Sequence, residues 1–188
     1  MTATPQPVEV SPGERFSLRD FSGYDKGRGF FWQLAWVIAS NTLMNRLWFP
    51  RRLRVAVLRA FGATIGERLV IRHTTKIQWP WNVTIGDDCW IGEDVQLLSI
   101  EKITIGSNTC ISQGAVICAG SHDPSSPTFE CNNAPIVIGD GCWIALRAAV
   151  LAGSTIGDGV TVGACALVSG DVPAGTTLVA PRSIALPR

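Results

Sequence analysis

An aliphatic residue recurs at every sixth position over most of this 188-residue chain. Two residues are inserted before Ile85 and before Ile105, and a longer segment interrupts the count before Ile138. The recurring position always holds Ile, Leu or Val: Ile65, Ile71, Ile77, Ile85, Ile91, Leu97, Ile105, Ile111, Ile117, Ile138, Ile144, Val150, Ile156, Val162 and Val168. Neither the 3.6-residue period of an α-helix nor the two-residue period of a strand produces strict sixes. The period predicts a coil with three flat faces, in which each unit forms one short strand and one corner.

Three such units close one coil, so the repeat predicts an all-β solenoid of about five coils with parallel, stacked strands. The aliphatic side chains would point to its axis, each stabilising the fold by about 1.5–3 kcal/mol on burial. Gly commonly follows the aliphatic residue, as in the stretches "IGDDCW", "IGSNTC" and "IGDGCW". We expect these glycines to supply corner dihedrals that residues with a Cβ resist.

The length and charge indicate one compact unit in two parts. We expect a tail and helical annex over residues 1–62 and the solenoid over residues 63–188. The 16 Lys and Arg residues balance the 15 Asp and Glu residues, so no overall field attracts nucleic acid and no such partner is expected. The charge is uneven along the chain, because residues 14–68 hold ten basic residues against four acidic ones.

The six cysteines do not form a recognisable framework. No pair has CxxC spacing, and no signal peptide with a cleavage site is recognised, so neither a disulfide scaffold nor a zinc site is predicted. We expect reduced thiols packed in the core or wall of a cytoplasmic protein.

The segment Gly29–Phe49 is apolar but carries several polar residues, and it is too short to predict a membrane span. One interpretation is a helix that packs on the prism and covers the exposed edge of the first coil. The other is an interfacial helix that touches lipid with its aromatic residues beside a basic cluster. That cluster is Lys26, Arg28, Arg51, Arg52 and Arg54. A second helix is expected from about Arg51 to a glycine stop at Gly62.

The repeat breaks after Ser121, where one of the two histidines of the chain, His122, is followed by Asp123. Residues 123–135 then form a loop rich in proline and serine, ejected at a corner of the solenoid. Long loops on a rigid scaffold are often functional. A neutral imidazole accepts a proton near pH 7, and an adjacent carboxylate can orient it or raise its basicity. His122 and Asp123 are therefore the candidate catalytic residues.

From Phe21 to about Ala180 the chain resembles the hexapeptide-repeat acyltransferases, and among them the exopolysaccharide branch typified by colanic acid biosynthesis acetyltransferases. The matching stretches are "LRAFGATIGERLVI", "WPWNVTIGDDCWIGEDV", "ITIGSNTCISQGAVICAGSHDPSSPTF" and "APIVIGDGCWIA". The resemblance implies a left-handed parallel β-helix and a homotrimer with grooves between subunits. It also implies that His122 is the general base, which deprotonates a sugar hydroxyl or amine for attack on acetyl-CoA, and that no metal is required.

The resemblance also assigns cofactor-binding positions. The family's tryptophan after the loop matches Trp143, and the positions that contact acetyl-CoA match Leu146, Ala164, Ser169 and Gly170. Many relatives carry Lys where this chain has Gly170. Arg182, in the C-terminal "LVAPRSIALPR", is the candidate replacement for that charge near the cofactor phosphate.

The implied acceptor is a sugar, a nucleotide sugar or a lipid-linked glycan. The expected location is the cytoplasm, or the inner face of the membrane if the annex makes peripheral contact with lipid. The tryptophans Trp79, Trp81 and Trp90 are expected on the outer wall of the solenoid, as a subunit interface or a platform for sugar.

Two other function classes share this fold. A γ-type carbonic anhydrase needs three histidines on zinc, and this chain has only His73 and His122. A non-catalytic β-helix scaffold stays open, although it would not need a histidine beside the loop and a tryptophan after it.

Overall fold

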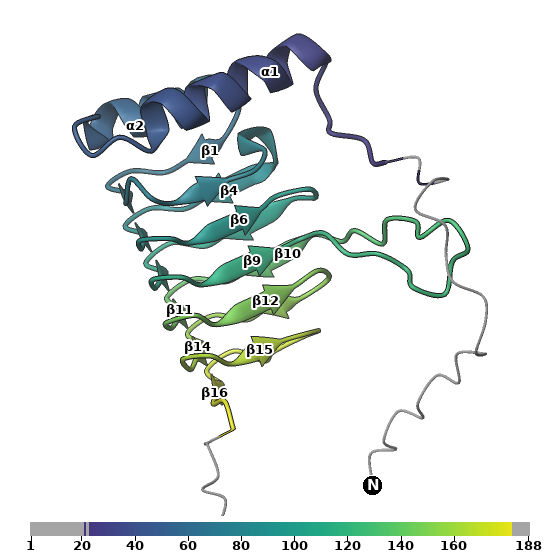
Figure 1. Ribbon diagram of the computed structural model, residues 1–188. Helices are drawn as coiled ribbons and strands as arrows, with labels where there is room; N and C mark the ends of the chain where they lie inside the picture. The colour runs from purple at the N-terminus through teal and green to yellow at the C-terminus, as the bar shows by residue number, and fades with distance from the viewer. Residues whose placement is uncertain (1–20, 22, 182–188) are drawn as a thin grey trace, which may run out of the picture.

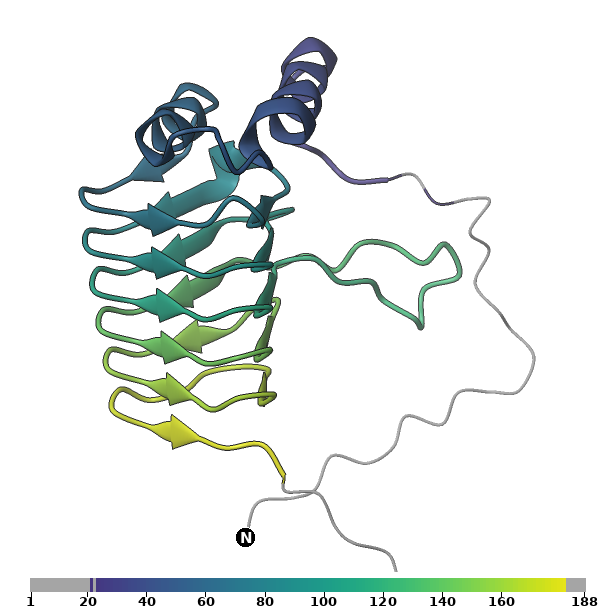
Figure 2. The same ribbon diagram turned by 60° about the vertical axis from the view of Figure 1, so that its left-hand side comes forward.

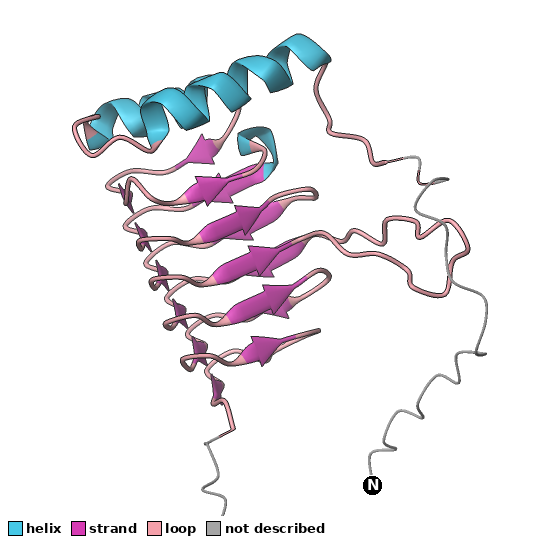
Figure 3. Ribbon diagram, viewed as in Figure 1, coloured by secondary structure: helices cyan, strands magenta, loops and turns pink. Residues whose placement is uncertain are grey.

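A computed structural model describes residues 21 and 23–181 and shows a three-faced prism of stacked coils with helices across one end (Figure 1; helices cyan and strands magenta in Figure 3). Each complete coil contributes one strand to each of three parallel sheets, here called A, B and C. Sheet A contains β1 (Thr64–Ile65), β4 (Val83–Ile85), β7 (Ile103–Ile105), β10 (Ile136–Ile138) and β13 (Thr155–Ile156). Sheet B contains β2 (Val70–Ile71), β5 (Trp90–Ile91), β8 (Cys110–Ile111), β11 (Trp143–Ile144), β14 (Thr161–Val162) and β16 (Thr177–Leu178). Sheet C contains β3 (Lys76–Ile77), β6 (Gln96–Leu98), β9 (Val116–Cys118), β12 (Ala149–Leu151) and β15 (Leu167–Val168).

The strand order confirms the predicted parallel solenoid. The first coil is β1 to β3, the fifth is β13 to β15, and β16 belongs to a sixth that begins with a bridge between Ile156 and Val172. The corners are named by the sheets they join, AB, BC and CA. The left-handed sense of the coil stays a prediction from the family resemblance.

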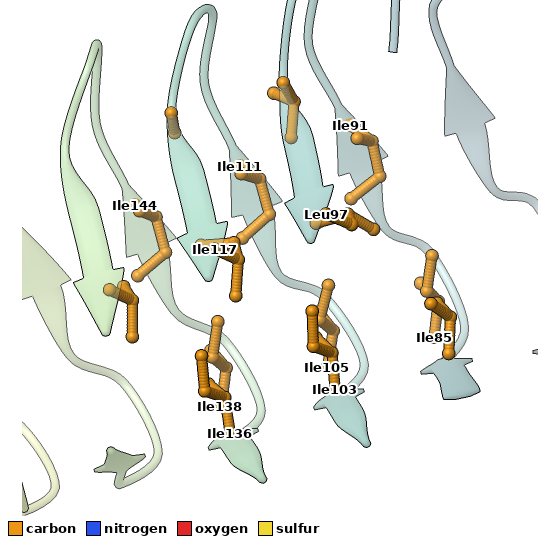
Figure 4. Close-up of a cluster of buried hydrophobic side chains, with 14 of the residues drawn as sticks. Ile85, Ile91, Leu97, Ile103, Ile105, Ile111, Ile117, Ile136, Ile138 and Ile144 are labelled. Carbon is orange, nitrogen blue, oxygen red and sulfur yellow. The ribbon is translucent and has the colours of Figure 1, made fainter. Parts of the chain in front are cut away.

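The core is a ladder of aliphatic side chains, mostly isoleucine, along the axis (Figure 4). In sheet A, Ile85 pairs with Ile105, Ile105 with Ile138 and Ile138 with Ile156, and each is at most 1% exposed. All fifteen residues of the six-residue repeat are buried. The predicted inward position is therefore confirmed, and the burial of these side chains is a large favourable contribution to holding the coils together.

The glycines that follow the aliphatic residue have a different role from the predicted one. None of those in the AB corner has a positive φ. A Cβ on Gly106 would lie 2.6 Å from the carbonyl carbon of Gly139, and one on Gly86 would lie 2.9 Å from that of Gly106. The glycine is needed because backbones of successive coils touch there, which leaves no room for a side chain.

The left-handed backbone conformation falls two residues later in the same corner. Arg68, Asp88 and Asn108 have φ of 56°, 56° and 54°, and Gly141 and Gly159 take the same place in the later coils. Asn and Asp tolerate this region better than most residues. The corner is therefore built by one position with no room for a Cβ and a second position with strained dihedrals.

Helix α1 (Phe30–Ala39) continues into the π-helix η2 (Ser40–Met44), and α2 (Arg51–Ala60) follows. Trp36 of α1 is 2% exposed and its indole N–H donates to the carbonyl of Gln78, 2.8 Å away. Buried Arg54 of α2 donates to the carbonyls of Met44, Arg46 and Phe49, and burial lowers its pKa. The Trp36 bond, together with the bonds from Arg59 to the carbonyl of Ile65, fastens the helices to the first coil, as the capping interpretation predicted, whereas the Arg54 bonds hold the annex together internally.

Most of the aromatic residues of the annex are not covered by that contact. Phe31 is 83% exposed and Trp48 71%, so packing on the prism buries Trp36 but leaves these two aromatic residues open. Within the described residues, no helix is long and apolar enough to cross a membrane.

The tryptophans of the wall are placed differently from one another. Trp79 is buried and stacks on Trp81 at 5.0 Å, within the CA corner that also holds the short helix η3 (Pro80–Asn82). Their indole N–H groups donate to the hydroxyl of Tyr24 and the carbonyl of Lys26. Of these three tryptophans, Trp90 alone is exposed on the wall, so the prediction of an outer-wall position was wrong for Trp79.

Candidate active site

The break in the repeat is a two-stranded ribbon that leaves the CA corner of the third coil. In both views it extends sideways from the prism between β9 and β10 (Figures 1 and 2). Backbone hydrogen bonds join Ala134 to Ala119 and Asn132 to Ser121. The paired region begins at residue 119, earlier than the predicted loop 123–135, because an extended backbone outside the coil must satisfy its own hydrogen bonds.

His122 lies on this ribbon, bridged to Cys131 on the returning arm. Its imidazole stacks on the ring of Phe129, with centroids 4.3 Å apart and planes 8° from parallel. Its Nδ1 lies 3.0 Å from the carbonyl oxygen of Phe129, and Phe21 approaches at 5.4 Å. His122 is an exposed residue, but its ring is held by a hydrogen bond and a stacking contact.

The hydrogen bond to Phe129 selects the tautomer of the neutral imidazole. A carbonyl oxygen only accepts, so Nδ1 must carry the proton and donate it. In the neutral ring Nε2 then has a free lone pair. This is the form that a general base requires, with a fixed ring and an unprotonated nitrogen directed away from the anchoring contact.

Asp123 follows His122 in sequence but serves the ribbon. Its carboxylate accepts hydrogen bonds from the backbone N–H of Ser125, at 2.9 Å, and from the Ser125 hydroxyl. These bonds lower the pKa of the Asp123 carboxyl. Within the part of the chain that is described, no hydrogen bond joins this carboxylate to His122. The orienting contact predicted for Asp123 is made instead by the carbonyl of Phe129.

Phe129 is the site residue that sequence reasoning missed. It has a φ of 51°, uncommon for a bulky residue, and this conformation turns its carbonyl and its ring toward His122. No repeat or motif marks it, and a left-handed aromatic residue is not expected from propensity.

The predicted cofactor residues lie at two different corners of the solenoid. Leu146 and Ala164 are exposed at the BC corner, where the N–H of Cys165 donates to the carbonyl of Leu146 across successive coils. Ser169 is exposed and Gly170 half-buried at the CA corner, beside the ribbon. A single chain therefore presents these positions as two separate groups.

A shallow pocket lies at the CA corner next to the ribbon. It is lined by Gly120, Ser121, Asn132, Ala134, Leu151, Ala152 and Ser169. The structure thus brings Ser169 close to the arms of the ribbon that carry His122. The N–H of Gly170 donates to the hydroxyl of Ser154, which fixes the backbone just after Ser169.

Trp143 stands on the outer face of sheet B, 52% exposed, with its indole N–H donating to the hydroxyl of Ser112. It shares this face with Trp90, two strands away, and both rings are open to a ligand or to another chain. Arg182 lies outside the described residues.

The cysteines and the second histidine do not form a site in the described chain. All six cysteines are free thiols, as predicted, and burial raises the pKa of Cys89 and of Cys142. His73 lies at the BC corner of the first coil, whereas His122 projects from the CA corner of the third. No group of three or more His, Cys, Asp or Glu side chains with a metal-binding arrangement occurs within the described residues.

Comparison with known proteins agrees with this architecture. Residues 135–170 match the family model "Bacterial transferase hexapeptide (six repeats)". The protein named "Putative colanic acid biosynthesis acetyltransferase WcaF" from Escherichia coli (strain K12) is 42% identical over 166 residues, which cover 84% of this chain and 90% of that protein. The structure of the hexapeptide-repeat acetyltransferase VCA0836 from Vibrio cholerae O1 biovar eltor, complexed with acetyl coenzyme A, has a TM-score of 0.69 and 25% identity, covering 78% of this chain and 79% of that one.

A more distant relative points the same way. The lipopolysaccharide biosynthesis O-acetyl transferase WbbJ of Escherichia coli (strain K12) is 32% identical over 108 residues, or 51% of this chain and 55% of that protein. The similarity to WcaF extends over nearly the whole of both chains and includes the ribbon and the coils on either side of it. The chain belongs to the hexapeptide-repeat acetyltransferases and is an acyltransferase of that family.

Proposed function

We propose that this protein transfers the acetyl group of acetyl-CoA to a hydroxyl of a sugar in surface polysaccharide synthesis, with His122 as the general base. The observation that carries the proposal is the hydrogen bond from Nδ1 of His122 to the carbonyl of Phe129, which leaves Nε2 free to accept a proton. The similarity to WcaF and to WbbJ supports a glycan acceptor and favours an oxygen nucleophile over an amine.

His122 performs two proton transfers in this reaction. Its Nε2 takes the proton of the acceptor hydroxyl as the oxygen attacks the carbonyl carbon of the thioester. The resulting imidazolium keeps its Nδ1–H on the Phe129 carbonyl and then gives the Nε2 proton to the departing sulfur of coenzyme A. The products are an O-acetyl sugar and free coenzyme A, and His122 returns to its starting state. Acetyl-CoA itself supplies the activated acyl group.

The chain offers suitable groups for acetyl-CoA on the two corners. The pocket beside the ribbon combines the polar Ser121, Asn132 and Ser169 with the apolar Leu151, a lining that suits an arm containing amides. Exposed Leu146 and Ala164 offer backbone and apolar contacts at the other corner. Trp143 offers a flat face to the sugar or the cofactor.

A homotrimer is the assembly that fits this division. If neighbouring chains pack side by side, the BC corner of one meets the CA corner of the next, and both groups of residues line one groove. Exposed apolar side chains support such packing: Leu167 is 65% exposed, Leu146 47% and Leu151 37%. In this arrangement each active site needs two copies.

The proposed place of action is the cytoplasm, at the inner face of the membrane, on a lipid-linked glycan. The basic charge and exposed apolar residues of the annex support a location near lipid. Nucleotide sugars and free sugars are the soluble alternatives for the acceptor.

The test is release of coenzyme A from acetyl-CoA by the purified protein with panels of lipid-linked glycans, nucleotide sugars and free sugars. Glycan-dependent release with wild-type protein, and its loss in His122→Ala, supports the proposal. Calorimetry with acetyl-CoA separates an enzyme from a scaffold, because a scaffold subunit would not bind it. Acetyl-CoA binding without transfer to any sugar would contradict the proposed acceptor class.

A further inference from the structure

The outward surface of the helical cap (residues 29–62) is apolar where a soluble helix is normally polar. Trp36 faces the prism. At about 100° per residue, Leu34, Ile38 and Phe31 lie within about 40° of the direction opposite Trp36. They are 43%, 55% and 83% exposed. The side of α1 that faces away from the protein is therefore a row of aliphatic and aromatic side chains.

The apolar surface continues past α1. Leu47 and Trp48, in the connection to α2, are 81% and 71% exposed, and Leu53 at the start of α2 is 52% exposed. Both views place the helices at the end of the prism opposite β16 (Figures 1 and 2). These residues therefore belong to one end of the molecule, not to scattered surface positions.

The charge of the cap is of one sign. No Asp or Glu occurs between residues 26 and 66. Arg28, Arg46, Arg51 and Arg52 are exposed, whereas Arg54 is buried and Arg59 pairs with Glu67. In the part of the chain that the structure describes, none of the four exposed arginines forms a salt bridge, so the apolar surface is bordered by unpaired cations.

We propose that this face of the cap docks on an anionic lipid bilayer. Aromatic and aliphatic side chains enter the boundary between headgroups and acyl chains, and exposed arginines gain from the negative surface potential. A second copy of the same face is a poorer partner, because it would bring arginines against arginines in an apolar contact. Arg54 does not take part, since its guanidinium satisfies three carbonyls inside the cap.

Docking sets the height of His122 above the lipid. The ribbon leaves the third coil, two steps of about 4.8 Å below the first. A helix layer adds about 10 Å. With the cap flat on the bilayer, the root of the ribbon stands about 20 Å from the lipid surface. This height favours, as the acceptor, a membrane-tethered glycan whose reacting sugar is several units from its lipid anchor, an inference that rests on the proposed function.

Flotation of the intact protein with vesicles tests the docking without any use of activity. The vesicles are phosphatidylcholine alone or with about 30% phosphatidylglycerol, at low and physiological salt. The wild-type protein is expected to float with the anionic vesicles, less so at higher salt. Phe31→Ser/Leu34→Ser/Ile38→Ser should lower the partition coefficient roughly 100-fold or more, and Arg51→Gln/Arg52→Gln about 25-fold.

Two matched controls separate the cap from general effects. Val179→Ser removes an apolar side chain that is 79% exposed beyond β16, at the far end of the prism. Lys102→Gln/Arg147→Gln removes two exposed cations from later corners of the prism, away from the cap. Both should float like wild type. Failure of the wild-type protein to bind anionic vesicles, or equal loss in controls and cap variants, overturns the proposal. A lower molecular mass of a cap variant in light scattering would also overturn the proposal, because it would show that this face joins copies of the chain.

Acceptors anchored in the same vesicles test the height. A sugar on a long spacer should be acetylated faster than one on a spacer of a few ångströms, and only wild type should gain from anchoring. A soluble acceptor is the reference, because cap variants should acetylate it as wild type does. If the wild-type protein acetylates neither the anchored nor the soluble acceptor, the proposed function is contradicted. If it acetylates acceptors on long and short spacers at equal rates, only the proposed height is contradicted.

Discussion

The Nδ1 atom of His122 lies 3.0 Å from the carbonyl oxygen of Phe129, across a turn of the ribbon that also stacks the two rings. The pair fixes both the plane of the imidazole and the position of its proton. A histidine on a projecting loop would otherwise rotate freely and populate both of its neutral tautomers. Phe129 is thus a positioning residue, and the contact explains how an exposed histidine can act as a base.

His122→Ala should lower kcat by roughly 100-fold or more, since a positioned general base contributes about 10²–10⁴. The KM for acetyl-CoA should change little, because the imidazole is not among the proposed cofactor contacts. Steady-state kinetics with a light-scattering check of the assembly measures this. Turnover near the wild-type value would remove His122 from the mechanism.

Asp123→Asn should keep kcat within about fivefold of wild type, as expected for an exposed charge with no direct partner at the base. The amide oxygen of Asn can still accept the bonds from Ser125, so the ribbon keeps its turn. The matched variant Ser125→Ala removes one of those bonds and should act similarly. A loss above tenfold in Asp123→Asn alone would show that the carboxylate serves His122 directly.

Phe129→Gly should lower kcat about tenfold by removing the stacking ring, a contact worth about 0.5–1.5 kcal/mol. Glycine accepts the left-handed backbone at this position, so the carbonyl can still reach Nδ1. Phe129→Tyr keeps the ring and is the control. NMR of the imidazole nitrogens should show the Nδ1–H tautomer retained in both variants, and an unchanged kcat in Phe129→Gly would exclude a positioning role for the ring.

Gly106→Ala should destabilise the solenoid by about 1–3 kcal/mol, because the new Cβ meets backbone atoms of Gly139 and Asp140 at 2.6 and 2.7 Å. This corresponds to a Tm lower by roughly 2–12 °C for a chain of this size. Gly141→Asn is the control, since nothing lies within 4 Å of its Cβ position and Asn108 already has this conformation one coil earlier. Equal losses of Tm in the two variants would contradict the close-approach explanation.

Cys165 should be the most reactive thiol, and acetyl-CoA should protect it. It is exposed and follows Ala164 at the proposed cofactor corner. Cys89 and Cys142 should react slowly near neutral pH, because burial raises their pKa and keeps them as neutral thiols. Alkylation mapped by mass spectrometry measures both effects, with half-buried Cys110 on sheet B as the internal reference. Equal labelling of Cys165 with and without acetyl-CoA would place the cofactor elsewhere.

The sequence determined the solenoid, its inward residues and the place of its interruption. These follow from period alone, because each six-residue unit builds its own strand and corner and its aliphatic residue has only one interior to enter. The helix ending at Ala60, close to the expected stop at Gly62, is equally local. His122 could be singled out for the same reason, as a titratable side chain at the one long break in a regular pattern.

The tertiary structure decided what depends on chain segments meeting. The glycines of the AB corner are required by the next coil, whose contacting residues lie 17 or more positions away in sequence, so the local sequence does not show whether a dihedral or a contact demands the glycine. The partner of His122 depends on how the ribbon pairs its arms, which placed the Phe129 carbonyl, and not the adjacent Asp123, at Nδ1. The helical cap is a further example, because its composition allowed both covering of the first coil and contact with lipid. Only the packed position of Trp36 showed which side faces the prism and which side is left apolar and exposed.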